Sequence, residues 1–135
     1  MFVRHVYTDL WLDGVDRGAG IVDPTWEAVS VAIRSLDATT RSLITLADRE
    51  WSDHFLLVVG KWEDRVLVNS TKNNKIFFSL VDASSSGGTR TLLIAGEREE
   101  YDDNKLVPID WAIEAAQHFY ETGERKSTMS WMRDA

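Results

Sequence analysis

Residues 107–123 read VPIDWAIEAAQHFYETG, and this stretch decides the fold. Its apolar residues recur at the three- and four-residue spacing of an amphipathic helix. They are Ile109, Ala112, Ile113, Ala116, Phe119 and Tyr120. Proline suits the first turn of a helix because its missing N–H would be unpaired there, and glycine often ends a helix in the left-handed conformation. The sequence therefore predicts a helix that Pro108 opens, that Gly123 closes, and that packs by one face.

A second helix is predicted nearer the beginning of the chain. Asp23 can cap a helix N-terminus and Pro24 suits the first turn, so we expect a helix to begin there. Apolar residues then recur at helical spacing as far as Asp37. These residues are Trp26, Val29, Ile33 and Leu36. The chain thus has one early helix and one C-terminal helix.

The remaining pattern is that of strands. Residues 2–12 are rich in β-branched and aromatic side chains and predict an N-terminal strand, which a loop at 14–20 follows. Short apolar runs separated by charged or Asn-containing turns predict successive antiparallel strands. These runs are 43–47, 55–60, 65–69 and 76–81, and a connection at 84–88, a strand at 91–95 and a charged loop at 97–105 follow them.

The run at 55–59 is apolar at every position, which is typical of a central strand covered on both faces. We expect helices on one side of it and another element on the other. The pattern as a whole predicts the α+β class, with residues 1–135 forming a single domain. Its sheet is mainly antiparallel, and the early helix and the C-terminal helix pack on it.

Composition limits the class of protein. The 135 residues are 44% apolar, enough for a single core, and include no cysteine, so disulfides and thiolate metal sites are excluded. We expect a cytoplasmic protein, since the chain has neither a leader-like segment nor an apolar run long enough to span a membrane. Its formal charge of −7 disfavours direct nucleic-acid binding and favours a basic partner.

Known catalytic and cofactor patterns are missing from the sequence. The three histidines are far apart and lack metal-ligand spacing, and no nucleophile turn accompanies the pair Asp53-His54. Gly18-Ala19-Gly20 begins like a dinucleotide-binding fingerprint but has Asp23 at the third glycine position. We therefore predict no catalytic residues, no metal and no cofactor.

The C-terminal segment resembles the signature of a known family. Its pattern is Val107-Pro108-x-x-x-Ala112-x-x-Ala115-Ala116-x-x-Phe119-x-x-Thr122-Gly123-Glu124-Arg125, followed by Ser130-Trp131. This pattern resembles the C-terminal signature of the Imm1 family of bacterial immunity proteins. The stretch from Ser84 to Thr89 looks like the glycine-containing connection that members carry before the final helix. The resemblance covers about the last fifty residues well and the first half only in the order of its elements.

The resemblance implies a small, non-enzymatic, cytoplasmic antitoxin of a polymorphic toxin system. Such a protein would bind a cognate secreted toxin domain and block its active site. The partners of such proteins often look like nucleic-acid-directed toxins, prominently cytidine-deaminase-like domains. The expected partner is therefore a basic toxin, with no direct contact to nucleic acid or membrane.

Two groups of residues are candidates for binding this toxin. The first is the acidic segment, in which five acidic residues face two basic ones within 97–105. It can be a solvated loop, or it can mimic phosphates and enter a basic cleft, with Tyr101 as an aromatic anchor. Its candidates are Glu97, Glu99, Glu100, Tyr101, Asp102 and Asp103. The second group comprises large aromatic residues beside charges, namely Trp51 and Trp62 with Glu63.

Two other functions stay open from the residues alone. The first is a small α+β enzyme that uses His54 with Asp53 or Glu63, although Glu63 and Asp64 fit a tight turn better than an acid/base pair. The second is a scaffold or interaction domain unrelated to toxins. The absence of a catalytic motif favours the inhibitor over the enzyme.

Overall fold

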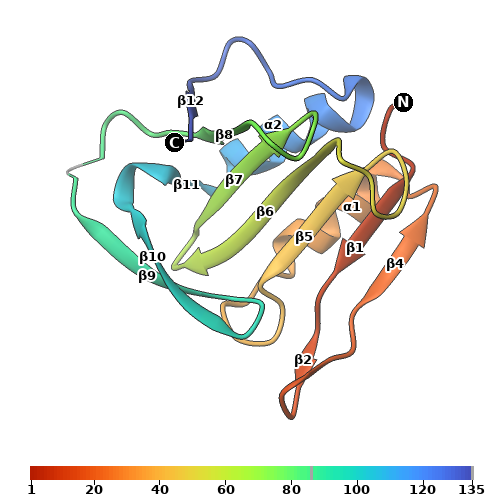
Figure 1. Cartoon of the computed structure of the whole chain (residues 1–135), viewed down its shortest axis with the longest axis horizontal. Coiled ribbons are helices and arrows are strands. Elements are labelled where there is room, and N and C mark those ends of the chain that lie inside the picture. Colours follow the sequence, from red (N-terminus) through yellow and green to blue (C-terminus); the bar gives the residue numbers. More distant parts are fainter. Residues whose placement is uncertain (86, 135) are drawn as a thin grey trace.

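The computed structural model describes residues 1–85 and 87–134, and its main feature is a curved antiparallel sheet (Figure 1). Within the described residues the sheet has eight strands in the order β12-β8-β7-β6-β5-β1-β4, and β11 pairs with β7 beside β8. Every pairing is antiparallel. The strands are β1 (His5–Thr8), β4 (Ala19–Val22), β5 (Leu43–Ala47), β6 (Phe55–Trp62), β7 (Arg65–Thr71), β8 (Phe77–Leu80), β11 (Leu106–Pro108) and β12 (Trp131–Arg133). The predicted α+β class is confirmed.

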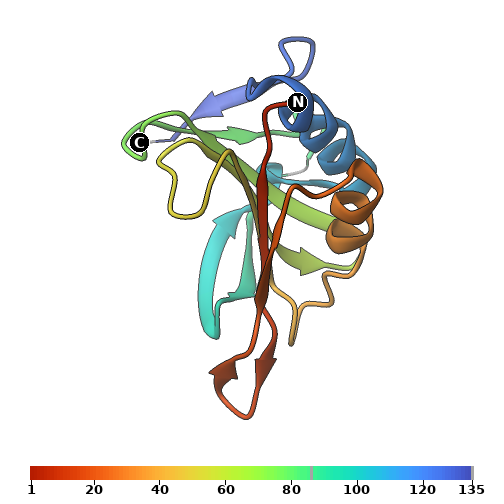
Figure 2. The same ribbon diagram turned by 90° about the vertical axis from the view of Figure 1, so that its right-hand side faces the viewer.

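Two helices cover one face of the sheet (Figure 2), namely α1 (Trp26–Arg34) and α2 (Ile109–Thr122). The predicted left-handed end of α2 is confirmed, since Gly123 has φ 74° and its N–H donates to the carbonyl of Phe119. The predicted cap of α1 is wrong. Thr25, not Asp23, is the N-cap, and its hydroxyl accepts a hydrogen bond from the N–H of Ala28. Asp23 has φ 50° and lies two residues before the N-cap.

The main core lies between the helices and the sheet. Side chains alternate between the two faces of a strand, so every second residue of β1, β5, β6 and β7 points toward the helices. The fully buried members on these strands are Val6, Ile44, Leu46, Leu56, Val58, Val66 and Val68. Val29 and Ile33 of α1 and Ala112, Ala116 and Phe119 of α2 meet them. The helical periodicities thus predicted the buried stripes well.

A hairpin lies on the opposite face of the same sheet (Figures 1 and 2). It consists of β9 (Thr89–Ile94) and β10 (Glu97–Asp102), so the predicted charged loop at 97–105 is wrong for most of its length. Leu92 of β9 packs on Val59 and Leu67 in a second apolar cluster. Gly60 permits this close approach, because a Cβ atom there would lie 2.8 Å from the Leu92 side chain. The hairpin is the expected second cover of the central strand β6.

Other segments differ from the prediction. The predicted loop at 14–20 contains parts of two strands, because β2 (Trp11–Leu12) pairs with β3 (Val15–Asp16) and β4 begins at Ala19. Trp131, for which no strand was predicted, belongs to the edge strand β12 and pairs with Leu80. The predicted connection at 84–88 includes Ser86, which lies outside the described residues. Strands of two or three residues are too short to have a periodicity of their own, so only their pairing with a partner strand defines them.

A candidate partner-binding face

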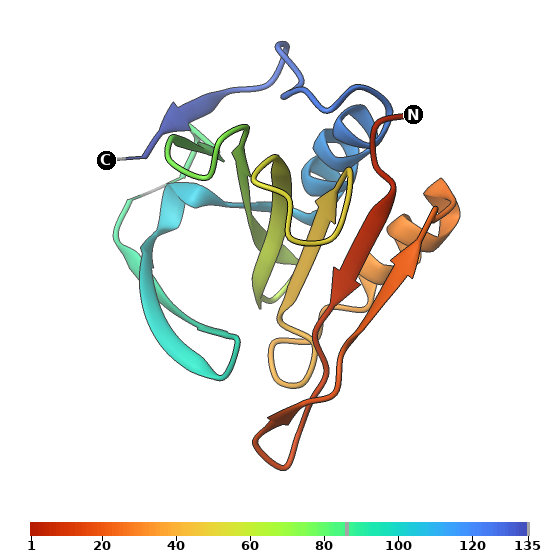
Figure 3. The same cartoon turned by 45° about the vertical axis from the view of Figure 1, so that its right-hand side comes forward.

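The sheet face away from the helices, called the open face here, is exposed over β4, β1, β5 and part of β6 (Figures 1 and 3). Its residues alternate with those of the main core along each strand. On β6, for example, Leu56 is fully buried against the helices, whereas Leu57 points to the open face and is half-buried. The open face thus combines apolar side chains with access from solvent, as binding sites do.

A cavity of about 700 Å³ is hollowed into the open face. Its floor is formed by Leu43, Thr45 and Ala47 of β5 and by Phe55 and Leu57 of β6. Other lining residues carry polar groups or large aromatic rings. They are His5, Tyr7, Asp16, Arg49, Glu50, Trp51 and Ser52, and Gly20 also lines the cavity. The site therefore has an apolar floor and a polar border.

Tyr7 and Asp16 fix one side of this border. The Tyr7 hydroxyl donates a hydrogen bond to the Asp16 carboxylate, whose other oxygen accepts from the backbone N–H groups of Leu10 and Gly18. Burial, with the adjacent Asp16, raises the pKa of Tyr7 to about 12. Burial opposes ionisation of Asp16, but these three hydrogen bonds lower its pKa. A negative carboxylate is thus held at the border by a protonated phenol.

The segment 49–52 forms the opposite side of the cavity, and Trp51 is its most unusual residue. Its side chain is 90% exposed, and its backbone has φ 60°, a left-handed conformation that bulky residues rarely adopt. Glu50 beside it lies 3.7 Å from the imidazole of His5, measured from Oε2 to Nε2. The structure thus brings the predicted contact residue Trp51 to a cavity that the sequence did not reveal.

His54 faces away from the cavity. Its Nε2 atom lies 2.7 Å from the carbonyl oxygen of Gly123, and its ring packs against Phe2 and Phe119 with centroids 4.5 and 5.7 Å away. The imidazole therefore links the end of α2 to the beginning of β6. Asp53 is exposed, and this geometry does not favour the alternative of an enzyme that uses Asp53 and His54.

The acidic residues of the hairpin lie on β10, on either side of Tyr101. Glu97, Glu99, Glu100 and Asp102 are exposed on β10, whereas Tyr101 is half-buried and packs on the second apolar cluster. The Tyr101 hydroxyl donates to Glu99 at 2.6 Å. Burial and this carboxylate raise the pKa of Tyr101 to about 12. Tyr101 therefore anchors the hairpin to the sheet.

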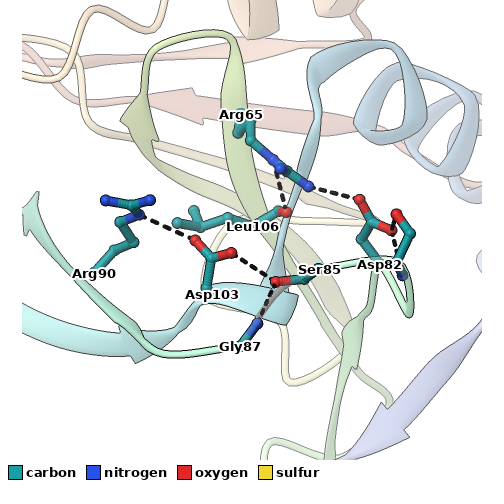
Figure 4. A network of polar contacts seen from close by, with 8 residues as sticks. Arg65, Asp82, Ser85, Gly87, Arg90, Asp103 and Leu106 are labelled. Carbon is teal, nitrogen blue, oxygen red and sulfur yellow. Dashed lines mark hydrogen bonds and ion pairs between the residues drawn. The ribbon is translucent and has the colours of Figure 1, made fainter.

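Asp103 differs from its acidic neighbours because its carboxylate is used inside the fold (Figure 4). It is buried, accepts from the Ser85 hydroxyl at 2.6 Å and pairs with Nε of Arg90 at 3.1 Å. These hydrogen bonds, that of Ser85 first, lower its pKa despite partial desolvation. The Arg90 guanidinium also lies 3.8 Å from the ring centroid of Trp62. Asp103 and Trp62 thus stabilise the attachment of the hairpin.

A second ion pair supports the same region (Figure 4). Nη2 of Arg65 donates to the buried Asp82 carboxylate at 2.6 Å, and its Nε donates to the carbonyl of Leu106 at 3.1 Å. The pKa of Asp82 is lowered by the Ser84 hydroxyl, against the effect of burial, and by Arg65. Arg65 thereby joins β7, β11 and the segment that follows β8. Glu63, by contrast, is exposed in the two-residue turn between β6 and β7, where the predicted tight turn is confirmed.

Comparison with protein families matches residues 17–133 to the family described as Immunity protein Imm1. The chain belongs to the Imm1 family. The match covers most of the chain, including the first half from residue 17 onward, where the sequence pattern alone gave little support. A comparison with curated proteins finds no match. Membership in an immunity protein family implies a cognate toxin as partner. It suggests a role that is not enzymatic.

The described part of this Imm1 protein has neither a metal-binding cluster nor a membrane-spanning helix. Among residues 1–85 and 87–134, no group of three or more His, Asp or Glu side chains is arranged to hold a metal ion. The same residues include no helix of the length and apolarity that crossing a membrane requires.

Sequence reasoning missed several residues of this site. His5, Tyr7 and Asp16 come from the first sixteen residues, and the pairing of β1 with β5 brings His5 and Tyr7 near Glu50 and Trp51. Asp16 of β3 joins them through its hydrogen bond with Tyr7. The alternation of His5 and Tyr7 with buried Val6 was the available signal. It indicates a strand with one accessible face.

Proposed function

We propose that this Imm1 protein binds a cognate toxin domain with its open face and neutralises the toxin by blocking its active site. One observation carries the proposal. The two helices cover one side of the sheet, whereas the other side has a cavity of about 700 Å³ with the exposed Trp51 on one border and Tyr7 and Asp16 on the other. The acidic hairpin β9–β10 packs on the same side of the sheet. A recessed apolar surface with an exposed aromatic residue and a charged rim is typical of protein interfaces.

Charge supports a basic toxin. The chain has a formal charge of −7, and Glu97, Glu99, Glu100 and Asp102 expose their carboxylates on the hairpin beside the open face. A toxin that acts on nucleic acid, such as a cytidine-deaminase-like domain, needs a positive substrate groove. Opposite fields accelerate the association of two proteins. We therefore propose a nucleic-acid-directed toxin as the partner.

The residues predicted to bind the toxin have different roles in this proposal, because only some of them are accessible. Trp51 and the four exposed carboxylates are accessible to a partner, and Glu63 is accessible at the β6–β7 turn. Tyr101, Trp62 and Asp103 are engaged within the fold, by the sheet, by Arg90 and by Ser85 respectively. We propose that these three hold the hairpin in the shape that the toxin meets.

The direct test is co-expression with the toxin domain encoded beside the gene for this chain. We expect survival of the host, a stoichiometric complex after purification, and loss of toxin activity in that complex. The catalytic assay is hydrolytic deamination of cytidine in nucleic acid. Absence of a complex would contradict the proposal, and a neutralised toxin with another activity would contradict the deaminase assignment alone.

A charge-reversal variant tests the position of the interface. The changes Glu99→Lys, Glu100→Lys and Asp102→Lys on the hairpin should slow association with the toxin and flatten its salt dependence. The matched control is Glu27→Lys, Glu114→Lys and Glu121→Lys, because these exposed residues lie on the helices and change the net charge equally. An equal loss of association rate in the two variants would remove the hairpin from the interface.

A further inference from the structure

The cavity on the open face combines an apolar floor with acidic groups. Its floor is apolar, through Leu43, Ala47 and Leu57, while Asp16 and Glu50 contribute carboxylates to its lining. Arg49 is the arginine of this lining, and its Nη1 atom donates to Asp48 at 3.0 Å. An occupant with an aliphatic stem and a cationic head would satisfy both parts of the cavity.

Trp51 adds an aromatic surface to the same cavity. An indole that is 90% exposed stabilises the free protein little, and its left-handed backbone, with φ 60°, costs about 1 kcal/mol or more. A strained, exposed tryptophan indicates a role in binding rather than in folding. Tryptophan is also the aromatic residue that attracts a guanidinium most strongly.

The protein already contains such an arrangement elsewhere. Arg90 lies 3.8 Å from the ring centroid of Trp62 and donates to the carboxylate of Asp103 at 3.1 Å. The cavity offers the same elements, an indole and carboxylates beside an apolar floor, in Trp51, Glu50 and Asp16. In the first case the arginine belongs to the chain itself, and in the second it must come from a partner.

We propose that the cavity between Trp51, Glu50 and Asp16 receives an arginine side chain of the toxin, together with the residues that flank it. The volume of about 700 Å³ exceeds the need of one side chain and lies within the roughly 300–1,000 Å³ of pockets that hold larger ligands. This inference rests on the proposed function and names the chemistry of the contact. The arginine would be one that the toxin uses in its substrate groove, so its capture contributes to the blocking.

The first experiment needs no toxin. The isolated ¹⁵N-labelled chain is titrated with the peptide acetyl-Gly-Arg-Gly-amide and with its citrulline counterpart, which has the same shape without the charge. The indole N–H signal of Trp51 is assigned by its loss in Trp51→Phe. We expect a saturable shift of this signal, with binding of the arginine peptide about tenfold tighter than that of the citrulline peptide.

Two variants locate this binding. Glu50→Gln should weaken the binding of the arginine peptide about three- to tenfold. Trp111→Phe, which alters a half-exposed tryptophan on α2, should leave this binding unchanged. Equal binding of the two peptides would overturn the proposal, as would a Trp51 signal that does not move. Both altered residues are exposed, so the variants should keep the fold.

The second experiment uses the complex with the toxin. We expect Trp51→Ala and Glu50→Gln each to weaken the complex at least about tenfold. In either variant background, substitution of the toxin arginine that enters the cavity should cause little further loss of affinity. Trp111→Ala is the control and should bind within about twofold of the unaltered chain. Affinity unchanged in both cavity variants would overturn the proposal.

The two experiments separate the inference from the proposed function. A chain that binds the arginine peptide at Trp51 but no toxin would contradict the proposed function and support the cavity chemistry. A chain that neutralises the toxin but does not distinguish arginine from citrulline would overturn the cavity chemistry alone.

Discussion

The two faces of the sheet use the same strands in opposite ways. On β6 the helix-covered face presents Leu56 and Val58, both fully buried, whereas the open face presents Phe55 and Leu57, both half-buried beside the cavity. One face fills space between packed elements, and the other leaves space that a partner can fill. In an alternating strand a single sequence can thus encode a core and a binding surface together.

The largest expected effect compares the neighbours Leu56 and Leu57. Leu56→Ala should lower the free energy of unfolding by about 3–4 kcal/mol, because it leaves a cavity in the main core. Leu57→Ala should cost only about 1 kcal/mol, because its side chain already borders solvent. Chemical denaturation of the two variants measures the difference. Equal losses would mean that the open face is packed as tightly as the core.

The next prediction concerns the ion pair that supports the hairpin region. Arg65→Met should lower the free energy of unfolding by about 2 kcal/mol, because it leaves the buried Asp82 carboxylate without its cation. The double variant with Asp82→Leu should recover part of this loss, since the uncompensated charge is then removed. A double-mutant cycle measures the coupling energy between Arg65 and Asp82. Purely additive losses of stability would contradict the prediction.

Acid should loosen the open-face hairpin before the core. The pKa values of Asp82 and Asp103 are lowered by hydrogen bonds and by arginine partners, so these carboxylates stabilise the fold fully above their unfolded pKa of about 4. This contribution is lost as the pH falls through the folded pKa values. Hydrogen exchange below pH 4 should show β9 and β10 losing protection before β6. Asp103→Asn should reduce this pH dependence, and simultaneous loss of protection in all strands would contradict it.

The smallest expected effect separates stability from binding at Trp51. Trp51→Gly should raise the free energy of unfolding by up to about 1 kcal/mol, because glycine relieves the left-handed backbone and little buried surface is lost. The same variant should bind the toxin more weakly. Thermal unfolding and affinity measured on one preparation test both halves. A clear loss of stability would show that Trp51 supports the fold.

Local patterns predicted the secondary structure well where they were long. The spacing of Ile109 to Tyr120 placed α2 and its buried stripe, and the apolar runs placed β5 to β8 within two residues. The segment 97–105 was the main error. Its charges suggested a solvated loop, but pairing with β9 and the packing of Tyr101 make most of it a strand.

By itself the sequence determined the fold class, the two helices, the central strand and the resemblance to the Imm1 family, because each depends on spacing within a short window. Only the tertiary structure decided which charges are free. In the folded chain Asp103 pairs with Arg90, whereas Glu100 is exposed. Asp16, Glu50 and Trp51 line one cavity. The reason is that strand pairing joins residues far apart in the chain, and no local periodicity records which strands will be neighbours.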